Sequence, residues 1–263
     1  MLLKRVQAVE LADQPWFPAV IRDLTTDFLS FLAGALEIDR AGAELLAEAI
    51  RASGSRVVVD LGSGGAGPVV ALERQLAARG IEATFVLTDL FPNLSAFRRA
   101  AAASMGGIRY LEQPIDARAV PLELTGTRTL FNAFHHFEPP DALAILRDAA
   151  TRGEPIVVFE IVDRTLPKLL LVLLTPLLVL AATPFIRPIS WRRLVWTYLI
   201  PLVPLSCLWD GAVSHLRAYT RAELEAMATL VGEPGYEWRS GRLALRPRFF
   251  TATYLVGRPS RSA

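Results

Sequence analysis

The chain has 263 residues, a formal net charge of +2, one cysteine and three histidines. This length accommodates one large domain, or one domain with an appendage, around a substantial core. The single cysteine, Cys207, excludes an internal disulfide and a cysteine-rich metal site, and we expect it to be a small buried apolar residue. The spacing of the histidines does not match a zinc site, so no metal is expected.

Apolar residues make up 52% of the chain, and the mean hydropathy is +0.35. Soluble domains usually contain roughly 45–50% apolar residues even with glycine counted. The excess is concentrated in residues 165–209, which therefore need an explanation of their own. The first five residues are followed by polar residues, so we expect no secretory signal and a cytoplasmic protein.

The first 55 residues predict two helices. Apolar residues at helical spacing indicate a helix over residues 19–36, and Asp39 is expected to cap a second helix over residues 41–52. The arm before them carries Trp16 and Phe17, which either pin it to the core or form part of a lid over a substrate. We interpret residues 1–55 as an N-terminal helical cap.

Residues 57–68 combine three valines, an acid, four glycines and a proline. β-Branched residues suit a strand that is buried on both faces, and glycines permit positive φ and close approach by a ligand. Pro68 suits the first residue of a helix. The stretch predicts a strand, a glycine-rich turn and a helix N-terminus, whose free N–H groups favour a polar or anionic ligand. A nucleotide-like molecule is expected here.

Two kinds of nucleotide-binding loop fit these residues. Gly62-x-Gly64-x-x-Gly67 fits the dinucleotide fingerprint of NAD(P)-dependent oxidoreductases. Asp60-x-Gly62-x-Gly64 resembles the first motif of class I S-adenosylmethionine-dependent methyltransferases, whose third glycine position falls on Ala66 here. Dinucleotide loops normally carry no carboxylate two residues before the first glycine, which favours the methyltransferases. The resemblance implies cofactor contacts by Asp60, Gly62, Ser63 and Gly64.

The second and third strands also end in acidic residues. A strand over residues 83–89 ends at Asp89, where a carboxylate is suited to accept from both ribose hydroxyls, with Leu90 beside it. A helix over residues 93–104 and a strand over residues 108–111 follow. The pair Asp116 and Ala117 then resembles the adenine contact of the family, with a plain loop aspartate as the alternative.

Residues 129–137 predict a strand that runs into a turn rich in histidine and phenylalanine. The stretch closely resembles the fourth-strand motif of class I methyltransferases, in which such a turn faces the transferred methyl group. The resemblance implies a cofactor contact at Asn132 and a general base or substrate anchor at His135 or His136. Packing is the alternative for both histidines. Glu160, near the end of a strand over residues 155–161, is the reserve base.

Polar residues therefore collect at the carboxyl ends of five predicted strands. In open α/β sheets, ligands bind outside these ends. The residues expected at this edge are Asp60, Asp89, Asp116, Asn132, His135 and Glu160.

The last part of the chain predicts a helix over residues 221–231, capped by Thr220, and two strands over residues 236–245 and 249–256. A closing hairpin is typical of class I methyltransferases and is not expected in a dinucleotide-binding half. The resemblance thus covers residues 56–164 and 219–257. It implies an α/β, Rossmann-like class I methyltransferase fold: a seven-stranded, mostly parallel sheet with a closing antiparallel hairpin, plus a hydrophobic helical insertion.

The insertion occupies residues 165–218. It contains two uncharged runs, and residues 164–209 carry five basic residues and no acid. The first run barely reaches the length of a bilayer span, and prolines interrupt it. We favour a hairpin lying in the membrane interface, with arginines at the headgroups and Trp191, Trp196 and Tyr198 as belt residues. A lid or a homodimer interface is the alternative.

The predicted reaction is in-line displacement at the sulfonium methyl of S-adenosylmethionine, which requires alignment of the reactants in a dry pocket. The apolar insertion indicates a small lipophilic acceptor, with Asp210 and His215 reaching the mouth of the site. Whether oxygen, nitrogen or carbon is methylated stays open. Nucleic acid is not an expected partner. The alternatives are a Rossmann-type NAD(P)-dependent oxidoreductase and a non-catalytic membrane-surface protein with a degenerate methyltransferase fold.

Overall fold

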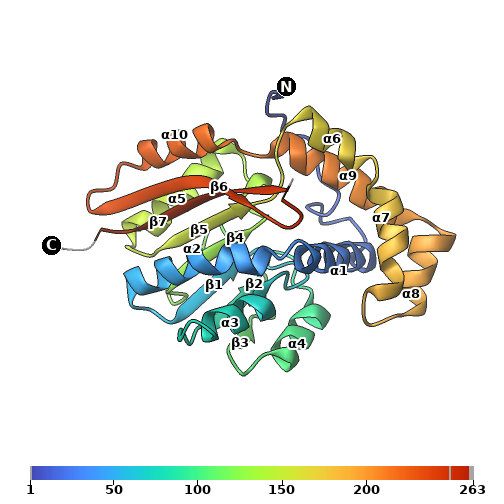
Figure 1. Ribbon diagram of the computed structural model, residues 1–263, viewed down its shortest axis with the longest axis horizontal. Coiled ribbons are helices and arrows are strands. Elements are labelled where there is room, and N and C mark those ends of the chain that lie inside the picture. The colour runs from blue at the N-terminus through green and yellow to red at the C-terminus, as the bar shows by residue number, and fades with distance from the viewer. Residues whose placement is uncertain (1, 249, 261–263) are drawn as a thin grey trace.

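The computed structural model describes residues 2–248 and 250–260, and its seven strands form one sheet in the order β3-β2-β1-β4-β5-β7-β6 (Figure 1). The strands are β1 (Val57–Leu61), β2 (Thr84–Thr88), β3 (Ile108–Tyr110), β4 (Thr127–Phe131), β5 (Ile156–Glu160), β6 (Tyr236–Ala244) and β7 (Thr251–Pro259). The first five are parallel, and β7 is antiparallel to β5 and β6. The predicted fold class is confirmed. The predicted start of the last strand, residue 249, lies outside the described residues.

Helices cover both faces of the sheet: α2 (Ile38–Ser53), α3 (Val69–Ala77) and α4 (Leu94–Ala103) on one, α5 (Pro139–Thr151) and α10 (Arg221–Val231) on the other. Val58 packs into the first of these two cores and Val59 into the second, and neither side chain is exposed. Successive side chains of a strand point to opposite faces, so an uninterrupted valine run is the pattern a central strand requires.

Of the two helix caps predicted from the sequence, the one at Thr220 is confirmed and the one at Asp39 is not. Thr220 caps α10 through a reciprocal pair of bonds with Glu223, as the sequence indicated. The prediction that Asp39 caps the second helix was wrong. The helix begins at Ile38, and the cap position is Glu37, at φ 50°. This turn buries both Leu36 and Ile38 in the core, and that burial sets the start of the helix.

The apolar insertion folds into short helices, which in Figure 1 lie together at one end of the molecule. They are α6 (Leu166–Val172), α7 (Thr175–Ala182), α8 (Trp191–Leu194) and α9 (Leu202–Arg217), with a 3-10 turn at Thr183–Phe185 and a π turn at Val195–Leu199. Among the described residues, no single helix is long and apolar enough to cross a membrane. Two pairs of helices, each bent at a short break, reach the necessary length and apolar composition only when both helices of a pair are counted together. They are Leu166–Val172 with Thr175–Phe185, and Trp191–Leu199 with Leu202–Arg217.

Helix α1 (Ala19–Ala35) packs against the insertion and shares a separate apolar core with it. Ile21, Leu24 and Phe28 of α1 meet residues of α7 and α9, among them Val179 and the buried Cys207. Two segments far apart in the sequence therefore form one helical layer beside the end of the sheet. The sequence interpretation had treated them as separate units.

Charged pairs join this layer to the sheet domain. Asp27 of α1 accepts from Arg99 of α4 at 2.6 Å and from Arg193 of the insertion at 2.7 Å. Arg193 is buried, so the prediction that it lies at lipid headgroups was wrong; the carboxylate of Asp27 draws it inward. Arg187 and Arg192 are exposed. Trp196, predicted to be a belt residue, is half-buried, since it packs against the shared core.

Candidate functional site

The glycine-rich loop follows β1 directly and turns through several left-handed residues. Gly62 has φ +71°, Gly64 +51°, Ala66 +63° and Gly67 +26°. Ala66 thus adopts the backbone conformation that the family pattern assigns to a glycine. The Ser63 N–H donates to the carbonyl of Thr88 at 2.9 Å, which ties the loop to β2. Pro68 occupies the cap position of α3, one residue earlier than the helical position predicted for it.

Asp60 lies inside the loop, almost fully buried. Its carboxylate accepts from Thr129 Oγ1 of β4 at 2.6 Å and from Ser63 Oγ at 2.7 Å. Burial raises the pKa of Asp60 to about 6, although these two hydrogen bonds oppose the shift. Among the described residues, no cationic side chain pairs with Asp60. The carboxylate joins β1, the loop and β4 and supplies negative potential beneath the loop.

Asp89 meets the same loop from the end of β2. Its Oδ2 accepts from the Gly64 N–H at 2.7 Å, and its Oδ1 accepts from the Phe91 N–H at 2.8 Å. The Ile115 N–H donates to the Asp89 carbonyl at 2.8 Å, which brings the predicted pair Asp116 and Ala117 to this edge.

The remaining predicted cofactor residues lie around this edge with partners of their own. Asp116 is bonded to Arg118 at 2.7 Å, and this pairing, against partial burial, lowers its pKa. Asn132 directly follows β4 at φ 54°, and its side-chain oxygen accepts from the Ile161 N–H at 3.2 Å. Leu90 is 44% exposed. The predicted strand-end residues are therefore gathered at one edge of the sheet.

Helix α1 lies directly over the loop, which the sequence did not indicate. Ser30 Oγ donates to the Gly65 carbonyl at 2.8 Å, and Asn93 donates to Thr26 Oγ1 at 3.2 Å. A Cβ on Gly65 would lie 2.5 Å from the Thr26 carbonyl oxygen. The hydroxyls of Thr26 and Ser30, one turn apart on α1, were the only available signal. The surface hollows beside β6, one lined by Glu37 and Leu243 and another by Arg221 and Trp238, do not include this loop.

His135 is held by Glu160 at the ends of β4 and β5. Its Nδ1 lies 2.7 Å from Glu160 Oε2, and both side chains are buried. The other carboxylate oxygen of Glu160 accepts from the backbone N–H of Phe134 at 2.6 Å. These bonds fix the histidine ring relative to the two strands. The sequence placed His135 and Glu160 at the same edge of the sheet but did not predict that they pair with each other.

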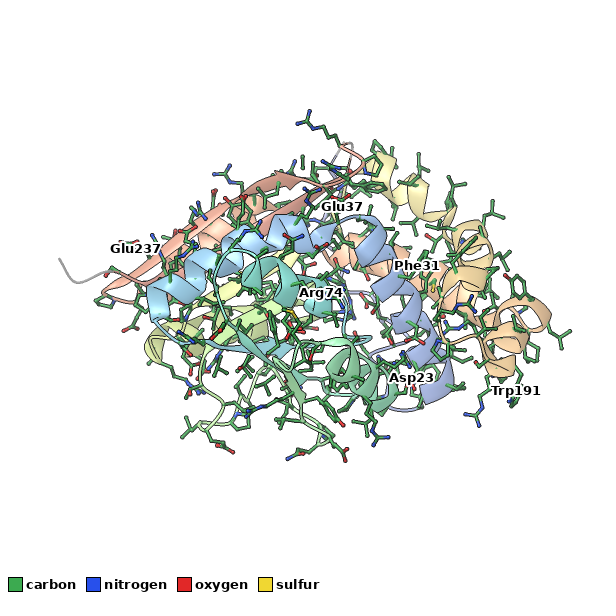
Figure 2. The ribbon with its side chains drawn as sticks, turned by 60° about the horizontal axis from the view of Figure 1, so that its bottom comes forward. Asp23, Phe31, Glu37, Arg74, Trp191 and Glu237 are labelled. Carbon is green, nitrogen blue, oxygen red and sulfur yellow. The ribbon has the colours of Figure 1, made fainter. Side chains whose placement is uncertain are left out.

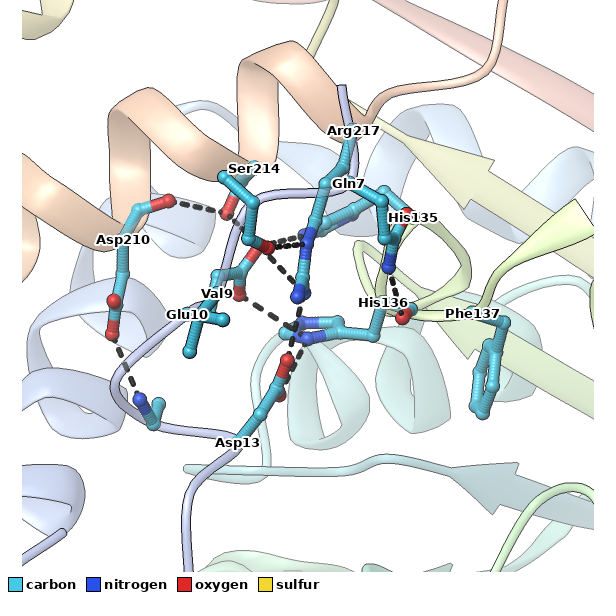
Figure 3. Close-up of polar contacts among 12 residues, drawn as sticks. Gln7, Val9, Glu10, Asp13, His135, His136, Phe137, Asp210, Ser214 and Arg217 are labelled. Carbon is cyan, nitrogen blue, oxygen red and sulfur yellow. Dashed lines mark hydrogen bonds and ion pairs between the residues drawn. The ribbon is translucent and has the colours of Figure 1, made fainter. Parts of the chain in front are cut away.

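The N-terminal arm brings two acids to His136 (Figure 3). His136 Nδ1 lies 2.8 Å from Asp13 and 3.2 Å from Glu10. Arg217 of α9 lies 2.7 Å from Asp13 and 3.3 Å from Glu10. Ser214 also donates to Glu10, at 3.1 Å. The sequence interpretation missed Glu10, Asp13 and Arg217, because only the tertiary fold brings residues 10, 136 and 217 together.

Two opposed effects act on the pKa of His136. Burial alone lowers the pKa, but the carboxylates of Glu10 and Asp13 outweigh it and raise the pKa to about 10. With these partners, His136 carries a proton at neutral pH. This favours an anchoring role for His136 over that of a general base and leaves His135 as the better candidate base.

The predicted substrate residues lie in the arm and the helical layer. Asp210 accepts from the backbone N–H groups of Leu11 at 2.6 Å and Ala12 at 3.1 Å, so it holds the arm in place. His215 Nδ1 lies 2.8 Å from the carbonyl of Gly211 in its own helix. Phe17 is buried in the core shared by α1 and the insertion. Trp16 is 69% exposed and packs edge-on against Phe17.

No protein-family model and no curated protein matches the chain. Among solved structures, a putative O-methyltransferase from Nostoc punctiforme is similar over 96% of this chain and 64% of its own, with 14% identity and a TM-score of 0.53. A magnesium protoporphyrin IX methyltransferase from Synechocystis, solved with bound SAH, is similar over 86% of this chain and 85% of its own, with 14% identity and a TM-score of 0.47.

An O-methyltransferase from neocarzinostatin biosynthesis, in complex with S-adenosylmethionine and 2-hydroxy-5-methyl naphthoic acid, is similar over 87% of this chain and 56% of its own, with 19% identity and a TM-score of 0.49. The strand order, the antiparallel β7 and the similarity to the Nostoc protein together define the fold. The chain has the Rossmann-like fold of class I methyltransferases, with an additional helical layer built from α1 and the insertion.

Proposed function

We propose that this protein is an S-adenosylmethionine-dependent methyltransferase acting on a small lipophilic acceptor. The observation that carries the proposal is the meeting of two carboxylates, Asp60 and Asp89, with the glycine loop of a class I methyltransferase fold. S-adenosylmethionine carries a sulfonium and an ammonium group, which negative potential at this loop favours. The pyrophosphate of a dinucleotide is anionic and would be repelled there, so the charges support the methyl donor over NAD(P).

Residues 56–164 and 219–257 would form the cofactor-binding core, and residues 1–55 and 165–218 would cover it. Asp89 would accept from the ribose hydroxyls, and the loop from Gly62 to Gly64 would approach the amino-acid end of the cofactor. Asp116, Ala117, Leu90 and Asn132 would surround the adenine and the methyl-bearing end. His135, oriented by Glu160, would remove a proton from the acceptor while the methyl group is displaced in line.

Calorimetry with S-adenosylmethionine and its demethylated product tests the cofactor. We expect binding by the unmodified protein and at least about tenfold weaker binding by Asp89→Ala, because a charged acceptor of hydrogen bonds is lost. Glu82→Ala is the control, since this carboxylate lies before β2 at the opposite edge of the sheet and is largely exposed. Binding of NAD(P), together with no binding of S-adenosylmethionine or its demethylated product, would overturn the proposal in favour of an oxidoreductase.

The acceptor is inferred from the surface of the insertion. In the part of the chain that the structure describes, 17 of the 27 exposed large apolar side chains lie in the segment from Leu166 to Trp209. A concentration of exposed apolar side chains on one segment favours an interaction site there. Arg187, Arg192 and Trp191 are exposed on the same segment, and Figure 2 places Trp191 at its outer end. Apolar, aromatic and basic side chains together favour an anionic lipid surface.

We therefore propose that the insertion contacts a membrane peripherally and that the acceptor is drawn from or near that surface. Anionic lipids of the cytoplasmic leaflet attract basic residues, so the inner face of the membrane is the proposed location. Incubating native host lipid extract with the protein and methyl-labelled cofactor, followed by mass spectrometry, would identify the acceptor.

Flotation with vesicles containing phosphatidylglycerol tests the membrane contact. We expect the unmodified protein to float with the vesicles. A variant with Leu173→Ser, Leu177→Ser and Leu199→Ser should remain in the soluble fraction, because these side chains are 63%, 64% and 75% exposed. Leu122→Ser with Leu230→Ser is the control, since both leucines are exposed outside the insertion. Unmodified protein that stays soluble, and is dimeric by light scattering, would indicate a dimer interface.

A further inference from the structure

Three side chains near the arm bring donor atoms together, and only His135 among them has a part in the proposed methyl transfer. Glu10, His135 and His136 each offer one ligand atom, and these atoms all lie within 4.8 Å of one another. Glu10 Oε1 lies 3.8 Å from His135 Nε2, and Glu10 Oε2 lies 3.2 Å from His136 Nδ1. Adjacent ligands of one zinc-like cation, with bonds of about 2.0–2.2 Å, lie about 3 to 3.5 Å apart.

Glu160 fixes which nitrogen of His135 is available. Its carboxylate lies 2.7 Å from Nδ1, so in the neutral ring Nδ1 is the N–H donor and Nε2 is the nitrogen with the lone pair. The lone pair of Nε2 faces the carboxylate of Glu10 at 3.8 Å, beyond hydrogen-bond distance. Ser214 and Arg217 also reach Glu10 Oε1, at 3.1 Å and 3.3 Å, and a cation between Nε2 and Glu10 would add a further positive partner for both acceptors. A carboxylate behind a ligating histidine is also the usual outer-shell arrangement of metal sites.

The local charge is suited to a divalent cation. Three carboxylates, those of Glu10, Asp13 and Glu160, surround the two histidines, and Arg217 supplies one positive charge. A bound cation would replace the proton that His136 otherwise carries, and with both histidines neutral the net charge of the surrounding groups is −2. Asp13 Oδ1, 2.8 Å from His136 Nδ1, is placed to become a fourth ligand. Figure 3 shows the side chains of Glu10, Asp13 and His136 converging on this place.

We propose that Glu10, His135 and His136, with Asp13, form a binding site for a divalent first-row cation of the zinc and cobalt type. Two imidazoles with carboxylates are donors that suit these ions. The cation would attach the N-terminal arm to the ends of β4 and β5. Cation binding is measured without cofactor or acceptor, so it stands or falls separately from the proposed function, in which the same nitrogen of His135 would act as the base only while no cation is bound.

The test uses the full chain after chelator treatment, without S-adenosylmethionine. Titration with Co²⁺ is followed by its visible d–d absorption, and titration with Zn²⁺ by calorimetry. We expect one equivalent of either ion to bind. Glu10→Gln and His136→Gln should each weaken binding at least about tenfold. His215→Gln is the matched control and should bind normally, since His215 bonds to its own helix.

Thermal unfolding separates loss of the site from loss of the fold. Zn²⁺ should raise the midpoint of the unmodified protein and of His215→Gln, because a ligand stabilises the state that binds it. It should raise the midpoint of a folded Glu10→Gln variant clearly less, because this variant binds the ion more weakly. A chelator-treated chain that binds no Co²⁺ or Zn²⁺ would overturn the proposal. Equal binding by the unmodified protein and by Glu10→Gln with His136→Gln would also overturn it.

Discussion

Replacing Gly65 with alanine is expected to destabilise the protein by about 2–3 kcal/mol. The new Cβ would overlap the Ser30 hydroxyl and lie 2.5 Å from the Thr26 carbonyl oxygen. The hydroxyl can rotate away, but the carbonyl belongs to the backbone of α1 and cannot. Either α1 or the loop must therefore shift. Urea unfolding measures the loss of stability, and calorimetry should show weaker binding of S-adenosylmethionine because the loop is displaced.

Gly34→Ala is the control for this substitution. Gly34 lies in α1, the helix that a Cβ on Gly65 would contact, and a Cβ on Gly34 itself would meet nothing within 4 Å. Alanine is the better helix former, so this variant should be as stable as the unmodified protein or more stable by up to about 1 kcal/mol. Equal unfolding midpoints for Gly65→Ala and Gly34→Ala would show that α1 does not rest on the loop in solution.

Arg217→Met is expected to cost about 3–5 kcal/mol or to release the N-terminal arm. The guanidinium group of Arg217 lies 3.3 Å from Glu10 and 2.7 Å from Asp13, and it donates to the carbonyl of Ala8 at 2.7 Å. Methionine keeps much of the volume but leaves the buried carboxylate of Glu10 without this partner. Urea unfolding gives the change in stability. Amide exchange over the arm before α1 should become faster.

Arg221→Met serves as its control, because Arg221 pairs with Glu225 on the surface of α10 and both side chains are about half exposed. An exposed pair of this kind contributes at most about 1 kcal/mol. The hypothesis that Arg217 holds the arm fails if the two variants show the same stability and the same exchange in the arm.

The sheet and its carboxyl edge could be predicted because their signals are local. Val57, Val58 and Val59 indicate a strand that is buried on both sides, and the glycines after Leu61 indicate a turn that needs positive φ. Parallel strands bring their ends to one edge, so Asp60 and Asp89 were expected near each other, and the loop joins them through Ser63 and Gly64. Neither step requires knowledge of distant contacts.

The polar cluster at His136 could not be predicted in the same way. Glu10 and Asp13 lie in an arm with no periodic pattern, and Arg217 ends a helix after a long apolar segment. Their meeting depends on how the arm crosses the strand ends, with Asp210 binding its backbone. The orientation of Arg193 is a similar case. Its sequence neighbours Arg192 and Leu194 are exposed, but the distant carboxylate of Asp27 holds Arg193 inside.

By itself, the sequence determined the class I methyltransferase sheet and the glycine loop with its acids. Strand periodicity, glycine conformation and strand-end polarity are properties of short segments, so they can be read without a structure. Only the tertiary structure decided that α1 lies over the loop, that it shares a core with the insertion, and that Glu10 faces both histidines. These contacts join residues over a hundred positions apart or elements whose order in space no local pattern specifies, so they depend on the burial of apolar surface and charge across the whole chain.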